Sequence, residues 1–462
     1  MKASSAGTAA AIAHLKSRLG PIVNDTASVR EHHSHGEGHH PPAAPDVVCL
    51  PRTTEDVAEI VRASATFGVP VIPFGAGTSL EGHVHALRGG ITIDLREMNH
   101  ILRIGQEDMD VTVEAGVTRL QLGKALRSTG LMFPIDPGAD ATIGGMTATR
   151  ASGTMAVRYG TMRENVLALR VVMPDGTITH TGTRARKSSS GYDLTRLFVG
   201  SEGTLGVITE VTLKLHPVPE AVSAAVCAFD TLGGAVNTVI ATIQLGLRVA
   251  RIELLDAKQI DAINRHSKTD YPLAPTLFFE FHGDHDRDVT EQAETLQGIA
   301  GEHGGHGFSF ATKLEDRERL WQARHHALYA AQALRPGARV WTTDVCVPIS
   351  RLAECIAETD ADNQGAPFPI CLVGHAGDGN FHLLYVLDPN SAEELAIASR
   401  LNDRLVERAL AMAGTCTGEH GIGYGKMASL KKEHGAGVEV MRSIKRALDP
   451  NNRMNPGKIV DI

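Results

Sequence analysis

Three glycine-rich segments constrain the fold of this 462-residue chain more than any other feature of its sequence. The first, IPFGAGTSLEG at residues 72–82, follows an apolar run, and the others lie at residues 134–161 and 200–210. Such segments are costly to order unless a large ligand lies against their backbone N–H groups. We therefore predict one domain with an extended, dinucleotide-sized cofactor; glycine loops at a tight bend or barrel are the alternative.

The first segment matches neither of two common phosphate-binding loops. A Walker A loop requires a Gly-Lys-Ser/Thr string, which the sequence lacks. A Rossmann fingerprint requires three glycines at the start of a helix, and Gly75 and Gly77 fit while Leu80 occupies the third position. Residues 81–90 are also a poor helix sequence. A non-helical glycine loop remains the better interpretation.

The composition excludes several classes of protein. Apolar residues make up 42% and charged residues 21%, as in soluble globular proteins. The length of 462 residues predicts two or three domains. A net charge of −8 with scattered basic residues argues against nucleic-acid binding. No apolar stretch is long enough to span a bilayer. Six dispersed cysteines without a Cys-x-x-Cys pair predict reduced thiols and a cytoplasmic protein, with peripheral attachment at the inner membrane as an option.

Strands and helices are expected to alternate from residue 46 onward. The sequence TTEDVAEIVRASATFG predicts a helix that Thr53 and Asp56 open as a capping box and Gly68 ends. Two β-rich runs around Pro-Asp-Gly in residues 164–182 predict a hairpin. Further expected elements are a short helix in 1–20, strands in 45–51, 69–74, 89–95 and 109–116, and helices in 118–130 and 314–334.

The tract EHHSHGEGHH at residues 31–40 contains five histidines. Its spacing fixes no metal geometry, and PPAAP follows it. We interpret it as a surface segment, able to act as a lid over an active site, with adventitious metal affinity.

A second histidine pattern predicts a metal site. Residues 370–386, ICLVGHAGDGNFHLLYV, form two strand-like runs around Asp378-Gly379, a pair favoured in two-residue type I′ turns. Such a turn would place His375 opposite His382 on one face of the hairpin, with Cβ atoms about 4.5–5.5 Å apart. Two imidazoles at this spacing can share a divalent ion. The alternative is a pair of hydrogen-bonded core histidines.

The loop GTCTGEHGIGYGK at residues 414–426 offers a third ligand, because it contains Glu419 and His420 among glycines. One of these adjacent side chains can bind a metal while the other faces a substrate. Two histidines and one carboxylate with an open coordination position form a catalytic metal site.

Together these segments resemble the FAD-binding domain of the vanillyl-alcohol-oxidase type. The resemblance is carried by residues 72–82, 141–153, 158–176 and 200–210, and it covers nearly the whole chain. It extends to the FAD-dependent dehydrogenases of D-2-hydroxy acids, which include cytochrome-linked D-lactate dehydrogenases and relatives acting on glycolate or D-2-hydroxyglutarate. The implied fold is α+β, a PCMH-type FAD-binding domain plus a ferredoxin-like α+β cap domain that binds substrate.

The expected organisation has four parts. Residues 1–41 form an N-terminal helix and the histidine-rich segment, and residues 42–219 form the FAD-binding domain. Residues 220–415 form the cap, and residues 416–462 return to the flavin site.

The resemblance also implies the residues that bind FAD. The family's covalent flavin attachment often uses a His in the phosphate loop, where this chain has Gly77-Thr78-Ser79, so we expect non-covalent FAD. The implied cofactor-binding residues are Phe74, Gly75, Ala76, Gly77, Thr78, Ser79, Leu80, Pro137, Gly138, Asp140, Thr142, Ile143, Gly144, Gly145, Met146, Thr149, Ser152, Gly153, Tyr159, Glu202, Gly206, Ile208 and Asn455.

The family patterns G-H-x-G-D-G-N-x-H and G-E-H-G-x-G match this chain residue for residue. By resemblance, His375, His382 and Glu419 bind a divalent metal (zinc, manganese or iron) and His420 is the catalytic base. Arg324, in a W-x-x-R pattern, would bind the substrate carboxylate. Relatives acting on 2-hydroxyglutarate have a lysine where we place Thr342, which favours a monocarboxylic acid.

The expected reaction is oxidation of a D-2-hydroxy acid, with D-lactate to pyruvate favoured, hydride transfer to flavin N5, and electrons passed to cytochrome c or a quinone. Alternatives are a D-2-hydroxyglutarate or glycolate dehydrogenase, an oxygen-using oxidase, and a non-catalytic histidine-rich metal-binding protein. The oligomeric state is left open, with a homodimer as one option.

Overall fold

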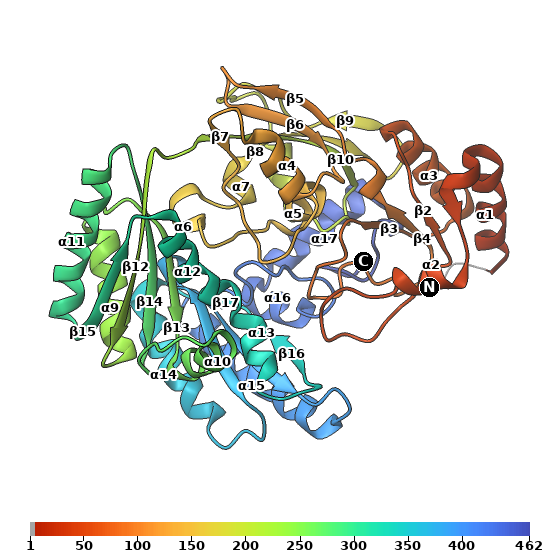
Figure 1. Ribbon diagram of the computed structural model, residues 1–462. Helices are drawn as coiled ribbons and strands as arrows, with labels where there is room; N and C mark the ends of the chain where they lie inside the picture. The colour runs from red at the N-terminus through yellow and green to blue at the C-terminus, as the bar shows by residue number, and fades with distance from the viewer. Residues whose placement is uncertain (1–4) are drawn as a thin grey trace. The chain divides into compact units, whose positions relative to one another are not determined.

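The computed structural model describes residues 5–462 and divides the chain into two compact units, whose elements are labelled in Figure 1. Unit 1 contains the chain up to Ser152, Gly160–Val218 and Glu419–Ile462. Unit 2 contains Gly153–Tyr159 and Pro219–Gly418. The C-terminal segment therefore folds with the N-terminal half of the chain. The part of the expected helix that falls on residues 1–4 lies outside the described residues.

The first layer of unit 1 is a four-stranded sheet of order β1-β2-β4-β3, in which β2 and β3 both run parallel to β4. Helices α1 and α3 pack on one another, and their apolar side chains share a core with this sheet. The strands are Val23–Asn24 (β1), Val47–Cys49 (β2), Val71–Phe74 (β3) and Ile91–Asp94 (β4), with helices Ser5–Leu19 (α1), Ala27–His32 (α2) and Thr54–Phe67 (α3) and short 3-10 turns Gly20–Ile22 (η1) and Leu95–Glu97 (η2).

Helix α3 begins and ends where the sequence predicts. The Thr53 side chain accepts a hydrogen bond from the Asp56 N–H, and the Asp56 carboxylate accepts one from the Thr53 N–H, both at 3.1 Å. Gly68 ends the helix at φ 66°, a left-handed conformation that glycine adopts without strain. The predicted capping box is confirmed.

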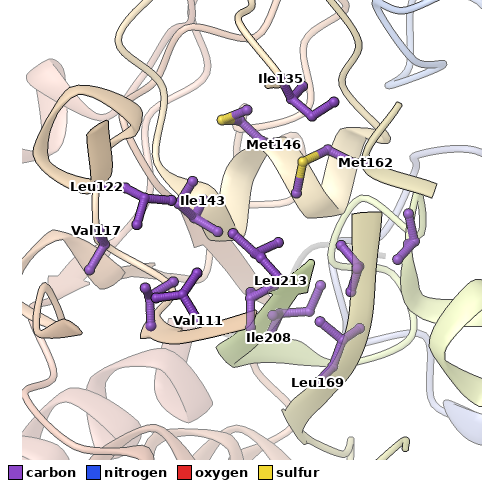
Figure 2. Packing of buried hydrophobic residues seen from close by; sticks show 14 of the residues in the cluster. Val111, Val117, Leu122, Ile135, Ile143, Met146, Met162, Leu169, Ile208 and Leu213 are labelled. Atoms are coloured by element: carbon purple, nitrogen blue, oxygen red, sulfur yellow. The ribbon is translucent and has the colours of Figure 1, made fainter. Parts of the chain in front are cut away.

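The second layer of unit 1 is an antiparallel sheet of order β5-β6-β10-β8-β9. Its β8–β9 hairpin turns at Pro174-Asp175-Gly176, as predicted. Strands and helices of this layer bury one apolar core, drawn in Figure 2. Strands β7 and β11 form a separate two-stranded antiparallel sheet. The remaining elements of unit 1 are Ile101–Gly105 (β5), Asp110–Glu114 (β6), Arg119–Leu126 (α4), Leu131–Met132 (β7), Ile143–Thr149 (α5), Met162–Asn165 (α7), Val166–Val172 (β8), Ile178–His180 (β9), Leu194–Phe198 (α8), Val207–Lys214 (β10), His216–Pro217 (β11), Met427–His434 (α16) and Gly437–Leu448 (α17).

The glycine-rich segment 134–161 contains helices that its sequence does not predict. Helix α5 begins after Thr142, whose hydroxyl accepts a hydrogen bond from the Gly145 N–H at 3.2 Å. Its buried face consists of Ile143, Gly144, Met146 and Thr147. Two adjacent glycines and a small apolar face hide the helical period in the sequence. The helix forms because tertiary packing of this face outweighs its weak helix propensity.

Unit 2 is built on a sheet of order β15-β12-β14-β13-β18-β19-β16, with β17 also pairing with β19. Its strands pair in antiparallel fashion throughout the described residues. The strands are Ala221–Phe229 (β12), Val249–Leu255 (β13), Thr276–Gly283 (β14), Gly305–Ala311 (β15), Arg339–Thr342 (β16), Val345–Cys346 (β17), Ile370–His375 (β18) and Asn380–Leu387 (β19).

Helices cover this sheet in two groups. Helices α9, α11 and α14 pack together on one side, while α10, α12 and α13 cover strands of the sheet on the other (Figure 1). The helices are Ala156–Tyr159 (α6), Leu232–Gln244 (α9), Ala257–Ser267 (α10), Asp286–Glu302 (α11), Leu314–His325 (α12), Ala327–Ala333 (α13), Ile349–Asn363 (α14) and Ala392–Ala411 (α15). The single helix predicted for 314–334 is wrong, since the chain breaks at His326 with φ −83° and ψ 3°.

The predicted two-residue turn between the metal-site strands is also wrong. A 3-10 turn, Ala376–Asp378 (η3), and Gly379 at φ 75° connect β18 to β19. His375 therefore pairs with Asn380, and His382 with Val373. A register shift of two residues keeps both histidines on the same face, because side chains alternate with a period of two. They become diagonal neighbours instead of directly opposed residues.

The histidine-rich tract is less exposed than expected. His33 is 3% exposed, and its ring nitrogens contact the Val29 carbonyl at 2.7 Å and the Asp94 carboxylate at 2.9 Å. The Gly36 N–H donates to Nε2 of buried His85 at 3.2 Å. The interpretation of the whole tract as surface is wrong, although His32 and His35 are exposed.

All six cysteines are free thiols. Among residues 5–462, no helix combines the length and apolar character that crossing a bilayer requires.

Candidate active site

The three glycine-rich segments meet within unit 1. A Cβ added at Gly75 would lie 2.3 Å from the Thr142 hydroxyl, and one at Gly203 would lie 2.8 Å from Pro73. The Glu202 N–H donates to the Ala148 carbonyl at 2.9 Å. The approaches at Gly75 and Gly203 are possible only for glycine. The three segments therefore form one glycine-lined region of unit 1. Backbone without side chains can lie directly against a large ligand.

The implied cofactor-binding residues fall into three groups. Ile143, Met146 and Ile208 are at most 5% exposed in the apolar core, so they could reach a ligand only through their backbone. Gly153 and Tyr159 belong to unit 2, where the Tyr159 hydroxyl hydrogen-bonds His282 Nδ1 at 2.7 Å. The remaining residues lie in unit 1. Their contacts with FAD stay predictions.

Glu202 and Asn455 organise the region around the C-terminal loop. The Glu202 carboxylate accepts hydrogen bonds from the backbone N–H groups of Ile422 and Gly423, at 2.7 and 2.8 Å. The Asn455 amide donates to the Glu202 carbonyl at 2.7 Å and to the His83 carbonyl at 3.0 Å. Glu202 therefore fixes the backbone just after His420.

Glu81 fixes the same loop from its other end. Its carbonyl accepts the Tyr424 N–H at 3.0 Å, and its carboxylate lies 3.6 Å from Lys426 Nζ and 3.5 Å from His40 Nε2. Burial would raise the pKa of Glu81, but Lys426, His40 and His420 together lower it to about 2. The side chain is thus a carboxylate at neutral pH, and it attracts the cationic groups of this loop.

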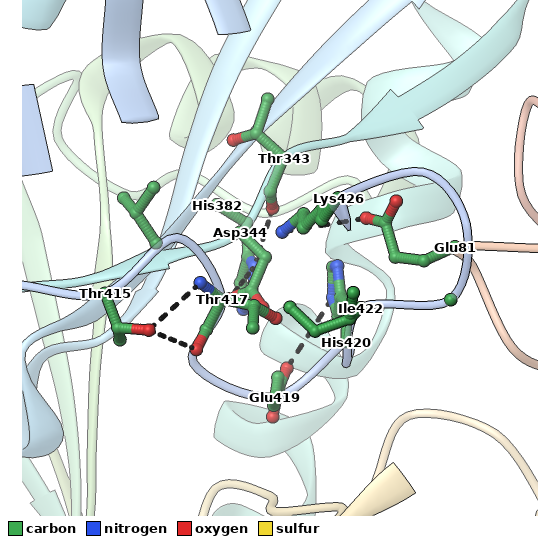
Figure 3. Close-up of polar contacts among 12 residues, drawn as sticks. Glu81, Thr343, Asp344, His382, Thr415, Thr417, Glu419, His420, Ile422 and Lys426 are labelled. Atoms are coloured by element: carbon green, nitrogen blue, oxygen red, sulfur yellow. Dashed lines mark hydrogen bonds and ion pairs between the residues drawn. The ribbon is translucent and has the colours of Figure 1, made fainter. Parts of the chain in front are cut away.

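Glu419 and His420 precede the loop residues that Glu202 and Glu81 hold. The Ser152 hydroxyl donates to Glu419 Oε2 at 2.5 Å. Figure 3 shows His420 beside Glu419, with Nε2 3.9 Å from Glu419 Oε1. The glycine-rich loop predicted from sequence is therefore held by hydrogen bonds from other parts of unit 1.

In unit 2, a polar region occupies one face of the sheet. Glu253, His375 and Asn380 are register partners in a row across β13, β18 and β19. His382 lies on the same face of β19, two residues from Asn380. Farther along the same face, Val373 and Leu384 pack with α10 and α13 in an apolar core. His375 and His382 therefore lie on the same buried face of the sheet, next to its apolar part.

His375 is held by a buried ion pair. Glu253 Oε1 accepts a hydrogen bond from His375 Nδ1 at 2.7 Å, while Oε2 accepts from Arg324 Nε at 2.8 Å and lies 2.6 Å from Nη2. Glu253 is 0% exposed. Burial alone would raise the pKa of its carboxyl, but His375 and Arg324 hold the pKa below its ordinary value.

His382 is held by the backbone. Its Nδ1 donates to the Thr343 carbonyl at 2.9 Å and lies 3.7 Å from Asp344 Oδ1 (Figure 3). Asp344 in turn accepts hydrogen bonds from the Asn380 amide at 2.8 Å and the Thr417 hydroxyl at 2.6 Å. The Asp344 carboxylate thus connects β19, through Asn380, to the loop that contains Thr417.

These contacts set the tautomers of both histidines. A carbonyl oxygen and an ionised carboxylate can only accept, so in the neutral ring each Nδ1 carries the hydrogen and each Nε2 carries the lone pair. The two rings are 5.5 Å apart between centroids, and one ligating atom of each lies within 4.8 Å of the other. Metal-binding imidazoles have this arrangement, with the second nitrogen donating to an oxygen. The pair therefore fits a divalent cation.

The predicted third ligand, Glu419, is the first residue of the C-terminal part of unit 1. It directly follows Gly418, the last residue of unit 2. A Cβ on Gly418 would lie 2.3 Å from the Asn380 amide, so Gly418 packs against the residue that pairs with His375. One peptide bond carries the chain from there to Glu419.

Sequence reasoning missed Glu253 and Asp344. The only signal for Glu253 is a carboxylate in the apolar strand VARIELL, and Asp344 follows two threonines without a motif. Arg324, which the sequence assigns to substrate, contacts Glu253 through its Nε–Nη2 edge. A substrate carboxylate would have to use the Nη1–Nη2 edge.

Two family models match the chain. The model described as "FAD binding domain" matches residues 45–182, and "FAD linked oxidases, C-terminal domain" matches residues 218–459. The chain therefore belongs to the FAD-linked oxidase family and is a flavin-dependent oxidoreductase.

Within this family the chain is similar to proteins named D-lactate dehydrogenase. "Probable D-lactate dehydrogenase, mitochondrial" of Danio rerio is 52% identical over 95% of this chain and 89% of its own. "D-lactate dehydrogenase (cytochrome), mitochondrial" of Arabidopsis thaliana is 47% identical, covering 96% and 80%. The corresponding "D-lactate dehydrogenase (cytochrome) 1, mitochondrial" of Saccharomyces cerevisiae is 43% identical, covering 91% and 74%.

Solved structures agree on the fold. A p-cresol methylhydroxylase with bound substrate matches with a TM-score of 0.82 at 18% identity, covering 99% of this chain and 98% of that one. An alkyldihydroxyacetonephosphate synthase matches with a TM-score of 0.75 at 22% identity, covering 97% and 84%. The predicted fold class and enzyme family are confirmed.

The expected location is wrong. The three relatives at 43–52% identity are all named as mitochondrial proteins, which contradicts the expectation of a cytoplasmic protein.

Proposed function

We propose that the chain oxidises D-lactate to pyruvate and passes the electrons to a cytochrome or quinone acceptor. The observation that carries this proposal is the similarity to D-lactate dehydrogenases at 43–52% identity over at least 91% of the chain. The names of two of these relatives specify a cytochrome. Thr342, where 2-hydroxyglutarate enzymes have a lysine, supports a monocarboxylic substrate.

FAD, when bound non-covalently against the glycine-lined region of unit 1, accepts the hydride from the substrate C2 carbon. The chain supplies the binding and proton chemistry. Arg324 binds the lactate carboxylate through its Nη1–Nη2 edge, because Glu253 already accepts from the Nε–Nη2 edge. His420 removes the hydroxyl proton as the general base.

A divalent cation, when held by His375, His382 and Glu419, favours loss of the hydroxyl proton through its positive charge. The lone pairs on the two Nε2 atoms support this ligand set, as does the glutamate one residue beyond unit 2. Imidazole and carboxylate ligands suit zinc, manganese or iron.

The test is anaerobic mixing of the purified protein with a panel of D- and L-2-hydroxy acids while the visible absorbance of oxidised flavin is recorded. We expect D-lactate to bleach the flavin faster than L-lactate, glycolate or D-2-hydroxyglutarate. Faster bleaching by D-2-hydroxyglutarate would contradict the substrate, and colourless protein after FAD addition would contradict the whole proposal.

Oxygen distinguishes the remaining enzymatic alternative. A dehydrogenase should reduce cytochrome c or a quinone analogue faster than it forms hydrogen peroxide in air. Stoichiometric peroxide would assign the protein to the oxidases.

A further inference from the structure

Glu253 connects the two halves of the proposed site within unit 2. It extends from the middle of β13, and its two carboxylate oxygens serve different partners. One partner is a proposed metal ligand, His375, and the other is the proposed substrate-binding residue, Arg324.

We infer that Glu253 is a positioning residue that orients His375 for metal binding and Arg324 for substrate binding at the same time. This inference rests on the proposed function. It adds a third element to that function, a buried carboxylate that neither ligand would touch.

The hydrogen-bond geometry carries the first half of the inference. His375 Nδ1 lies 2.7 Å from Glu253 Oε1, which fixes both the tautomer and the plane of the ring. The ring then presents the Nε2 lone pair on the same face of the sheet as His382. Partners of this kind typically change metal affinity by about 10–100-fold when removed.

The second half concerns Arg324, which lies in the last turn of α12. Its Nε and Nη2 groups both meet Glu253 Oε2, and its side chain is 13% exposed. This contact fixes the direction of the guanidinium plane. The Nη1–Nη2 edge is then oriented before a substrate arrives, which reduces the entropy cost of binding a carboxylate.

The substitution Glu253→Gln tests the inference with little change in shape. An amide offers one acceptor oxygen and one NH2 donor, whereas both partners donate. The charged guanidinium, with two N–H groups, takes the oxygen, so the NH2 faces His375. His375 must then accept at Nδ1 and carry its hydrogen on Nε2, which removes the lone pair that binds metal.

The matched control is Glu280→Gln. Glu280 lies in the neighbouring strand β14, accepts from His282 Nε2 at 2.9 Å and lies 3.5 Å from Arg251. It resembles Glu253 in burial and in having a histidine and an arginine as partners, but these partners are His282 and Arg251, to which no metal or substrate role is assigned. It reports what the loss of a buried carboxylate does in general.

The measurement is Mn²⁺ binding to FAD-loaded protein after metal is stripped by chelation, with thermal unfolding recorded in parallel. We expect Glu253→Gln to weaken the Mn²⁺ affinity by about 10–100-fold. Glu280→Gln should retain the wild-type affinity. Wild-type affinity in folded Glu253→Gln, or an equal loss in both variants, would overturn the inference.

A second variant covers the case in which Glu253→Gln does not fold. Glu253→Asp keeps the charge but is one methylene shorter, so it reaches only one partner at a time. Either the Mn²⁺ affinity should fall or the KM for D-lactate should rise, by about tenfold, the effect of losing about 1.4 kcal/mol. Wild-type values of both would overturn the inference.

His382→Ala separates this inference from the proposed metal site. If wild type and His382→Ala bind Mn²⁺ equally, the metal site itself fails, and the inference fails with it. If His382→Ala loses Mn²⁺ while Glu253→Gln retains it, only the inference about Glu253 fails.

Discussion

Asp256 provides a quantitative prediction about the strand that carries His375. It caps α10 by accepting the Gln259 N–H at 2.8 Å, and the same oxygen accepts the Leu372 N–H of β18 at 3.1 Å. Burial raises the pKa of this carboxyl from 3.8 to about 6, against the effect of both hydrogen bonds. Its ionisation at neutral pH therefore destabilises unit 2.

The magnitude follows from linkage. A rise of about 2 pKa units, at about 1.4 kcal/mol per unit, corresponds to about 3 kcal/mol, and the residual exposure of this half-buried residue reduces the figure to about 2 kcal/mol. Between pH 3.8 and about 6 the folded protein holds more protons on Asp256 than the unfolded chain does. Stability from this group is present below pH 3.8 and is lost as the pH rises to about 6.

Asp256→Asn should remove this cost, because the amide oxygen can accept both N–H groups and asparagine is an equally good N-cap. We expect the variant to be more stable than wild type by about 2 kcal/mol at pH 8, with the gain shrinking toward pH 4. Both tryptophans, Trp321 and Trp341, belong to unit 2, so their fluorescence during urea unfolding reports this unit.

The control is Asp286→Asn at the exposed first turn of α11, which should change stability by about 0.5 kcal/mol or less. A pH-independent difference for Asp256→Asn, or a loss of stability at pH 8, would refute the reasoning.

Three further predictions concern unit 1. In Glu202→Gln the new NH2 group faces the N–H of Ile422 or Gly423, which then lacks an acceptor. The free energy of unfolding should fall by about 1–3 kcal/mol and proteolysis of residues 419–423 should become faster, while unchanged cleavage would contradict this. Gly75→Ala adds a Cβ 2.3 Å from the Thr142 hydroxyl and should weaken FAD binding about tenfold in a flavin titration, whereas full FAD retention would show that the loop can move aside. His420→Ala should slow single-turnover flavin reduction by at least about 100-fold, and a near-wild-type rate would exclude it as the base.

The sequence predicts the local features of the fold well. The capping box of α3, its terminal glycine and the β8–β9 hairpin each depend on residues within a few positions of one another. Their physical causes are local hydrogen bonds and backbone preferences, which the sequence displays directly.

The β18–β19 hairpin shows where local rules stop. Asp378-Gly379 predicts a two-residue turn, but a Cβ on Gly379 would lie 2.0 Å from the Val347 carbonyl. Packing against that distant backbone accompanies a longer turn and a different register. The shared face of the histidines survives because the shift is an even number of residues.

The contacts that orient the site could not be predicted for a related reason. Glu253 is 122 residues from His375, and Asp94 is 61 residues from His33. Nothing in the local pattern indicates which carboxylate will meet which histidine. The metal-binding pattern shows which histidines to consider, while their tautomers depend on tertiary structure.

The requirement for a cation beside His375 and His382 is tested most directly by anaerobic flavin reduction with D-lactate in protein stripped of metal. We expect the stripped protein to keep its FAD, to bleach slowly, and to recover its rate when Mn²⁺ or Zn²⁺ is added, while His382→Ala does not recover. Full-rate bleaching in protein that elemental analysis shows to be metal-free would contradict this role.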